Sequence, residues 1–213
     1  MKKTTSKWLQ MLNVLSQIFF VIFILTGGLI IFHNVYYTPI KIVGASMEPT
    51  IHDAQFGVMD THSGRINKLK RFDIIIVQPD TKVEKYIIKR LIGLPGETLV
   101  FDGVGELYIN GAHVAQPFIE IEPHRQLTCT GGSKIGCYTS IKLNNQQYYV
   151  LGDNRGNSYD SRALGPFNRN HIVGVLFMIE GVCEPENDSS EHRVDLKTCA
   201  KRTYQWPIFF SHG

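Results

Sequence analysis

The N-terminal segment sets the tightest limit on the architecture, because it is long, apolar and uncharged. Residues 8–40 contain no Lys, Arg, Asp or Glu, and the 22 residues from Met11 to Phe32 within them are mostly apolar. A helix of about 20 residues spans the hydrocarbon core of a bilayer. Trp8 before the run, and Tyr36 and Tyr37 after it, are residue types that favour the two membrane interfaces. We therefore expect one transmembrane helix over this run.

The flanking charges predict the orientation of that helix. Lys2, Lys3 and Lys7 precede it, whereas Lys41 is the first charge after it. Positive charge is retained on the cytoplasmic side. We therefore expect residues 1–10 to be cytoplasmic, and the chain to be a single-pass membrane protein with the lipid bilayer as a partner.

Two other interpretations of the segment remain. A cleaved signal peptide has a shorter apolar region followed closely by a small-residue site. Val43-Gly44-Ala45 resembles such a site but lies more than ten residues beyond the run. A buried core helix is the other interpretation, and 22 residues is long for one.

The body of the chain shows short apolar runs separated by turn residues, which is typical of strands. Asn110-Gly111 is a strong hairpin signal, and no long stretch has a 3.6-residue period. Residues 38–180 are therefore expected to form an extracytoplasmic, mainly β domain of partly closed, barrel-like antiparallel sheets, with the anchor as the one expected helix. The expected strands are Ile40–Val43, Phe56–Met59, Phe72–Val77, Tyr86–Ile92, Thr98–Phe101, Leu107–Ile109, His113–Ala115, Tyr148–Leu151 and Ile172–Ile179.

Composition argues against several classes of protein. A formal charge of +3 without a basic stripe gives no reason to expect nucleic-acid binding. The chain has no phosphate-binding glycine loop and no His-Glu-x-x-His metal helix, so neither a metal nor a cofactor is expected. The sequence does not indicate an oligomeric state.

The chain has four cysteines, at positions 129, 137, 183 and 199. Cys129 and Cys137 bracket a glycine-rich loop and are the favoured disulfide pair. A zinc site is the rival, but the two-residue spacing of paired zinc ligands is missing. With Cys183 and Cys199 included, sequence alone leaves the pairing open.

Residues 181–213 are expected to be a polar, solvated tail, although the run 206–210 near its end is apolar.

A short turn, Val43 to Thr50, carries a serine that could act as a nucleophile. Gly44 gives the backbone freedom just before Ser46, and Pro49 prevents a helix just after it. An ordinary loop has the same composition. A serine needs a neighbouring base, and none of the eight histidines lies in a pattern that marks it as one.

Lys89 is the alternative base. It lies with Arg90 inside an otherwise apolar strand and shares a strand face with Ile87 and Leu91. Burial disfavours an ammonium, and a neutral lysine is a competent general base. An edge strand that uses Lys and Arg to prevent aggregation is the competing interpretation.

A third polar stretch, Gly152 to Arg162, directly follows an expected strand. It holds two Arg, two Asp and two Ser in eleven positions. Asp160 and Arg162 could form a charge-assisted pair that fixes the loop. Ser158 could accept a hydrogen bond from a buried lysine or orient it.

Together these stretches resemble type I signal peptidases, which are membrane-anchored serine proteases with a Ser–Lys dyad. The resemblance covers roughly Met11 to Glu180, and its motifs occur in the family's order. The matching pieces are Gly44–Thr50, Arg71–Val77, Lys89–Glu97 and Gly152–Arg162.

The resemblance implies a role for each matching residue. Ser46 would be the nucleophile and Lys89 its general base; Ser158 would orient Lys89, and Asp160 with Arg162 would hold the loop. The Ser46 N–H would stabilise the oxyanion. Gly44 stands where several relatives have a second oxyanion donor, so the source of that donor is open.

The resemblance also implies the substrates. These would be exported precursors bound as an extended strand and cut after small-x-small sites, which removes the signal peptide. Candidate pocket walls are Ile42, Met47, Ile51, Ile87 and Ile88.

Three competing functions differ from this one. A dedicated relative that matures a single pilin-like or conjugation substrate would share the dyad. A self-cleaving Ser–Lys repressor would need a DNA-binding N-terminus instead of the apolar run. A non-catalytic anchored binding domain would leave the basic pair inside an apolar strand unexplained.

Overall fold

The computed structural model divides into two units, Met1–Tyr37 and Thr38–Gly213. The residues it describes are 3–61, 68–80, 86–103, 105–119, 139–183 and 202–210. The expected pairing of Cys129 with Cys137, and the position of Cys199, lie outside these ranges.

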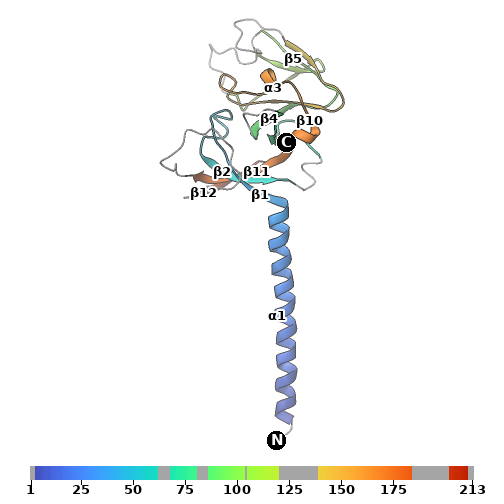
Figure 1. Ribbon diagram of the computed structural model, residues 1–213, viewed down its shortest axis with the longest axis vertical. Helices are drawn as coiled ribbons and strands as arrows, with labels where there is room; N and C mark the ends of the chain where they lie inside the picture. The colour runs from blue at the N-terminus through green and yellow to red at the C-terminus, as the bar shows by residue number, and fades with distance from the viewer. Residues whose placement is uncertain are drawn as a thin grey trace. The chain divides into compact units, whose positions relative to one another are not determined.

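The first unit is one long helix, α1, over Lys3–Tyr36 (Figure 1). Its apolar part, Lys7–Ile31, is 25 residues long and exposed along its length, so by length and composition it can cross a membrane. The helix therefore contains the expected span and continues at both ends. No Pro, and no charge after Lys7, interrupts it.

The main sheet of the second unit is antiparallel, and most of its strands lie where the apolar runs predicted them. Its order is β1-β2-β11-β3-β4-β9-β10, and β12 also pairs with β11. The strand bounds are β1 Tyr37–Lys41, β2 Gln55–Asp60, β3 Ile74–Val77, β4 Ile87–Gly93, β9 Gln147–Leu151, β10 Phe167–Asn168, β11 Ile172–Cys183 and β12 Arg202–Phe209.

A smaller antiparallel sheet has the order β7-β6-β5-β8. Its strands are β5 Thr98–Phe101, β6 Leu107–Ile109, β7 Ala112–Val114 and β8 Thr139–Lys142. The Asn110-Gly111 hairpin joins β6 to β7 as predicted, and both turn residues have positive φ.

The packing of the core explains why polar and apolar residues do not alternate along the central strands of the main sheet. On β3, Ile74 and Ile76 pack in one buried cluster, whereas Ile75 and Val77 pack in another. Successive side chains point to opposite faces of a strand, so both faces of this strand are buried. A third cluster joins the two sheets, with Ile92 of β4 packed among side chains of the smaller sheet.

The expected mainly β, antiparallel fold behind one long N-terminal helix is confirmed. In the described residues the main path ends at β1 and β10, so the sheet is not a closed barrel. Two short helical turns, α3 over Ser161–Leu164 and η2 over Arg169–His171, add to the single expected helix. Each is too short to show a helical period in the sequence.

Residues 202–209 differ from the expected solvated tail. Strand β11 continues to Cys183, and Arg202–Phe209 pairs with it as β12. The pairing is irregular between Ile179 and Gly181, opposite the segment that contains Pro207. Proline has no N–H to donate to a β-ladder, so a segment that contains proline is not typical of a strand. For this reason the composition of the segment did not predict β12.

Candidate active site

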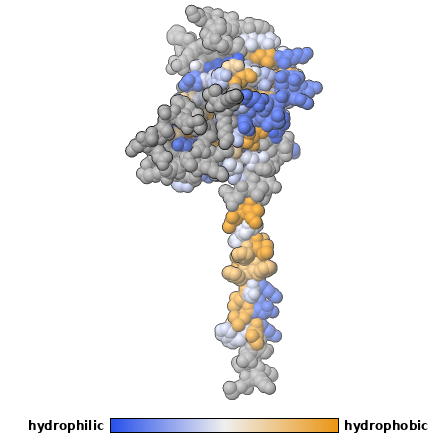
Figure 2. Space-filling model, in the orientation of Figure 1, coloured by the Kyte–Doolittle hydropathy of each residue, from blue (hydrophilic) through white to orange (hydrophobic). Residues whose placement is uncertain are grey.

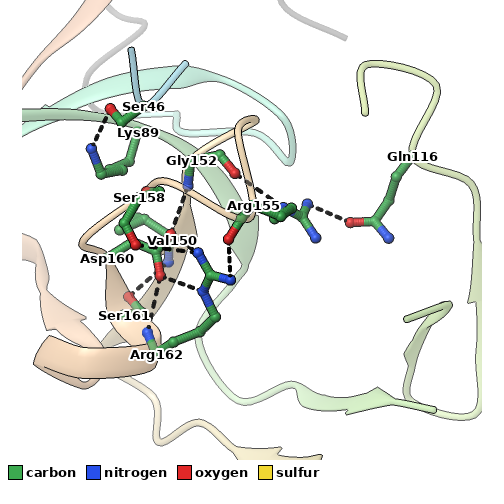
Figure 3. A network of polar contacts seen from close by, with 10 residues as sticks. All are labelled: Ser46, Lys89, Gln116, Val150, Gly152, Arg155, Ser158, Asp160, Ser161 and Arg162. Atoms are coloured by element: carbon green, nitrogen blue, oxygen red, sulfur yellow. Dashed lines mark hydrogen bonds and ion pairs between the residues drawn. The ribbon is translucent and has the colours of Figure 1, made fainter. Parts of the chain in front are cut away.

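Ser46 and Lys89 face each other from different parts of the sheet. Ser46 lies in the turn between β1 and β2, and Lys89 lies in β4. The Nζ of Lys89 is 2.8 Å from the Oγ of Ser46 (Figure 3). It is also 2.9 Å from the carbonyl oxygen of Ile88. Lys89 is only 4% exposed, whereas Ser46 is half-buried. The amine is therefore held against the hydroxyl in a largely water-free position.

The position of β4 decides between the two interpretations of Lys89. Strand β4 lies between β3 and β9, so it is not an edge strand. In the register Lys89 is paired with Ile75, which is fully buried. The edge-strand interpretation is therefore wrong, and the buried position of Lys89 has to be explained by its contact with Ser46.

Hydrogen bonds hold the serine turn on both sides. Gly44 has φ +98°, a conformation that glycine adopts readily, and its N–H donates to Oδ1 of Asp53 at 2.7 Å. Asn154 donates its backbone N–H to the carbonyl of Ser46 and its side-chain N–H to the carbonyl of Ala45, both at 3.1 Å. The turn is thus tied to the loop that follows β9.

A second set of hydrogen bonds joins the serine turn to the other face of β4. The guanidinium of Arg90 donates to both carboxylate oxygens of Asp153, at 2.8 and 2.6 Å. Asp153 also accepts from the hydroxyl of Thr50 at 2.6 Å, and the ring of Phe118 lies 4.0 Å below the guanidinium. Arg90 also donates directly to the Thr50 hydroxyl at 3.3 Å, so both basic residues of β4 contact the serine turn.

The expected pair of Asp160 and Arg162 is present and bidentate. The Arg162 guanidinium donates to both oxygens of the fully buried Asp160 carboxylate at 2.8 Å, and Gly152 donates its N–H at 3.0 Å. Burial alone would raise the pKa of Asp160, but the hydrogen bond and charge of Arg162 and the Gly152 N–H outweigh it and lower that pKa. The carboxylate therefore stays ionised and also caps α3.

Arg155 extends this network toward the smaller sheet. Its guanidinium donates to the carbonyl of Gly152 at 3.0 Å and to the side-chain oxygen of Gln116 at 2.6 Å (Figure 3). Burial, aided by the charge of Arg162, lowers the pKa of Arg155 to about 10, which leaves it protonated at neutral pH. The loop from Gly152 to Arg162 thus contains one buried guanidinium group, that of Arg155, and one mostly buried group, that of Arg162.

Ser158 differs from its expected contact. Its hydroxyl is buried and makes no hydrogen bond to Lys89; it lies close enough to the Asp160 carboxylate to help lower the pKa of that group. The Nζ of Lys89 is instead directed at Ser46 and the Ile88 carbonyl. The hydroxyl nevertheless lies at the site, because a Cβ on Gly152 would collide with both the Ser158 hydroxyl and the Ser46 carbonyl.

A cleft of about 420 Å³ opens at the dyad. Of the expected pocket walls, Ile87 and Ile88 line it. Ile42, Met47 and Ile51 do not; each is at most 1% exposed, and all three pack in the core cluster of the sheet. The complete lining is Val43, Gly44, Ala45, Ser46, Asp53, Tyr86, Ile87, Ile88, Lys89, Asn157 and Tyr159.

Several residues of the site had no role predicted from the sequence. Asn154 and Asp153 lie in the polar stretch that the sequence singled out, but their partners are more than 60 positions away. Asp53, Tyr86 and Tyr159 carry no local signal that distinguishes them from other turn and strand-end residues. Among the described residues no group of three or more His, Cys, Asp or Glu side chains could hold a metal ion.

Comparison with known proteins places the chain in a known family. The model of the family described as signal peptidase, peptidase S26, matches residues 11–180. This chain belongs to that family. The resemblance inferred from the sequence motifs is confirmed, and the chain is a serine endopeptidase of the signal peptidase I type. The match ends at residue 180, so it leaves out the last three residues of β11 and all of β12.

Individual relatives cover most of the matched region. Signal peptidase I V of Bacillus subtilis is 37% identical over 150 residues, which are 67% of this chain and 85% of that protein. Signal peptidase I T of the same species is 39% identical over 140 residues, 65% of this chain and 71% of that protein. A crystal structure of a signal peptidase I from Enterococcus faecalis V583 is 32% identical and covers 50% of this chain and 95% of its own, with a TM-score of 0.41. Family and apolar helix together fit a membrane-anchored enzyme.

Proposed function

We propose that this peptidase removes N-terminal signal peptides from exported precursor proteins, with Ser46 as nucleophile and Lys89 as general base. The observation that carries the proposal is the 2.8 Å separation of the Lys89 amine and the Ser46 hydroxyl at the edge of a cleft. A serine hydroxyl becomes a useful nucleophile when a neighbouring base accepts its proton.

The acylation step follows from this pair. The Oγ of Ser46 attacks the scissile carbonyl carbon while its proton passes to the neutral Nζ of Lys89. The carbonyl π electrons move to oxygen, and the resulting oxyanion is stabilised by the backbone N–H of Ser46. When the C–N bond breaks, the Lys89 ammonium returns the proton to the leaving amine, which becomes the N-terminus of the mature protein. The signal peptide remains as an ester on Ser46.

Deacylation reverses the proton path. Water attacks the ester carbonyl while Lys89 accepts one of its protons. Collapse of the intermediate breaks the bond to Oγ, and the ammonium protonates the departing Ser46 oxygen. The signal peptide leaves with a free carboxylate, and the enzyme returns to its starting state.

Lys89 is protonated and deprotonated twice in each cycle, so the polar groups around its amine affect both steps. We assign the buried Ser158 hydroxyl, which lies beside the Asp160 carboxylate, as an acceptor for the ammonium when it forms. Asp160 and Arg162 hold the loop that carries Ser158. Gly44 lacks the hydroxyl that several relatives use as a second oxyanion donor, so we assign only the Ser46 N–H to that role.

The cleft supports binding of an extended substrate. A precursor segment would lie beside the exposed backbone at the cleft, with alternate side chains directed at its walls. Ile87 and Ile88 line those walls, and the family resemblance implies cleavage after small-x-small sites. With residues 1–10 in the cytoplasm, residues 38–180 would meet precursors at the outer membrane surface.

The test is cleavage of a mixture of exported precursors by the full-length enzyme in lipid vesicles, with N-terminal sequencing of the products. We expect new N-termini directly after small-x-small sites, and none with Ser46→Ala. Cuts at unrelated sites would contradict the proposed substrate. Processing of many precursors indicates a general enzyme, whereas processing of one indicates a dedicated relative.

A further inference from the structure

Helix α1 carries amide side chains within its apolar span. Asn13 and Gln17 lie inside Lys7–Ile31, about 9 and 15 Å along the helix from Lys7 at 1.5 Å per residue. Both are exposed, and Figure 2 shows hydrophilic residues along one side of the N-terminal half of the helix. Polar side chains in the hydrocarbon region are unfavourable unless they find partners.

These amides belong to a regular seam. Gln10, Asn13, Gln17, Phe20, Ile24, Gly27 and Ile31 are separated alternately by three and four residues. That spacing places all seven on one helix face and is the pattern by which two helices pack with a left-handed crossing. The seam is amide-rich in its first half and mixes large apolar residues with one glycine in its second half.

Thr26 is a polar residue outside the seam whose hydroxyl finds its hydrogen-bond partners within its own helix. The hydroxyl of Thr26 donates to the carbonyls of Ile22 and Phe23 in its own helix, at 2.9 and 3.1 Å. A hydroxyl can be satisfied in this way because it has a single donor. A carboxamide has two donors and a strong acceptor, and an intact helix has no free N–H in its interior to match that acceptor. The seam amides therefore call for a partner outside the helix.

We propose that the seam is a parallel helix–helix interface with a second copy of this chain. Two copies insert with the same orientation, so each seam residue meets its own counterpart at the same depth. Carboxamides are self-complementary, because each can donate to and accept from the other. Gly27 has no side chain beyond Cα and therefore allows close approach of the two helix backbones in the second half.

The chemistry favours this partner over an apolar one. A helix of purely aliphatic side chains, such as the core of a signal peptide, would leave Asn13 and Gln17 without hydrogen bonds. A second copy supplies matching groups at both positions. The inference concerns the anchor and does not depend on the Ser46–Lys89 chemistry.

The test is resonance energy transfer between full-length chains that carry donor or acceptor fluorophores at the N-terminus. The chains are reconstituted in phosphatidylcholine vesicles over a range of protein-to-lipid ratios. The test variant is Asn13→Leu/Gln17→Leu, and the matched control is Ser16→Leu/Thr26→Leu, which removes two polar groups from outside the seam. Inserted protein is quantified after alkaline carbonate extraction, so all samples are compared at equal membrane content.

We expect wild-type transfer above the level of random proximity. The seam variant should need a protein-to-lipid ratio higher by about tenfold to reach the same transfer, given the strength of interhelical amide bonds. The control variant should stay within about twofold of wild type. Wild-type transfer at the random level would overturn the proposal, as would equal shifts for both variants. Loss of wild-type transfer on adding an equimolar signal peptide would assign the seam to substrate instead.

Discussion

The Nζ of Lys89 lies 2.8 Å from the Oγ of Ser46, although 43 positions separate the two residues in the chain. The serine stands on a turn held by Asn154, and the lysine on a central strand of the main sheet. Both side chains are thus fixed before substrate arrives, which is the arrangement that efficient proton transfer requires. The amine can accept the serine proton only in its neutral form.

The pH dependence of cleavage follows from that requirement. We expect kcat/KM to fall as the pH is lowered, with a limiting slope of one decade per pH unit, because protonation of Lys89 removes the base. The measurement is precursor cleavage over a pH series, with circular dichroism at each pH to confirm that the protein remains folded. A profile that stays flat into the acidic range in folded protein would contradict a lysine base.

The pair of Asp160 and Arg162 should dominate the acid sensitivity of the fold. The folded-state pKa of Asp160 is lowered, so its stabilising effect is complete above its unfolded-state pKa of about 3.9 and is lost as the pH falls through the lower, folded-state value. Asp160→Asn should lower the free energy of unfolding by about 3 kcal/mol at neutral pH, because it leaves the mostly buried Arg162 unpaired.

Denaturant unfolding at pH 7 and at pH 3 checks this effect, with Asp80→Asn as the control. The Asp80 side chain is 87% exposed and faces His171, so the control should change stability by less than about 0.5 kcal/mol. Asp160→Asn should also lose less stability than wild type between the two pH values. Equal acid sensitivity of Asp160→Asn and wild type would show that this carboxylate does not carry the effect.

Gly152 should be essential for the spacing between the serine turn and the loop that supports it. An added Cβ would collide with the carbonyl of Ser46 and the side chain of Ser158. Gly152→Ala should therefore move Ser46 relative to Lys89 and lower kcat by at least about tenfold, with a stability loss of about 2 kcal/mol.

Gly174→Ala is the matched control, since an added Cβ there meets the Sδ of Met59 at 2.9 Å and the carbonyl of Asp60 at 3.2 Å, away from the dyad. It should reduce stability while leaving kcat per folded molecule unchanged. The readout is kcat with active protein measured by active-site titration. Comparable kcat losses in both variants would show that an added Cβ lowers kcat by disturbing the fold in general, and not by displacing Ser46 from Lys89.

Local patterns predicted the elements and the identity of the site better than its contacts. The uncharged N-terminal run and the apolar strands follow from residue periodicity, which is local. Lys89 stood out because a basic residue inside an apolar strand breaks that pattern. Whether its strand was central or at an edge depends on pairing with β9, more than 50 positions away in the chain, and no local signal carries that pairing.

The pocket residues show the same limit. Ile42, Met47 and Ile51 flank the nucleophile in sequence, which made them plausible walls, but their side chains point into the core. Asp53 lines the cleft because its carboxylate reaches back to the N–H of Gly44. Such contacts depend on the conformation of the turn, which composition does not specify.

The most direct test of the Ser46–Lys89 dyad is the single-turnover rate of precursor cleavage by Ser46→Ala, Lys89→Met and the double variant. Groups that act as one unit are not additive. Each single substitution should therefore reduce the rate to the background without enzyme, with folding unchanged, and the double variant should be no slower. Substantial cleavage by Ser46→Ala would contradict the account, as would a Lys89→Met enzyme that cleaves at the wild-type rate.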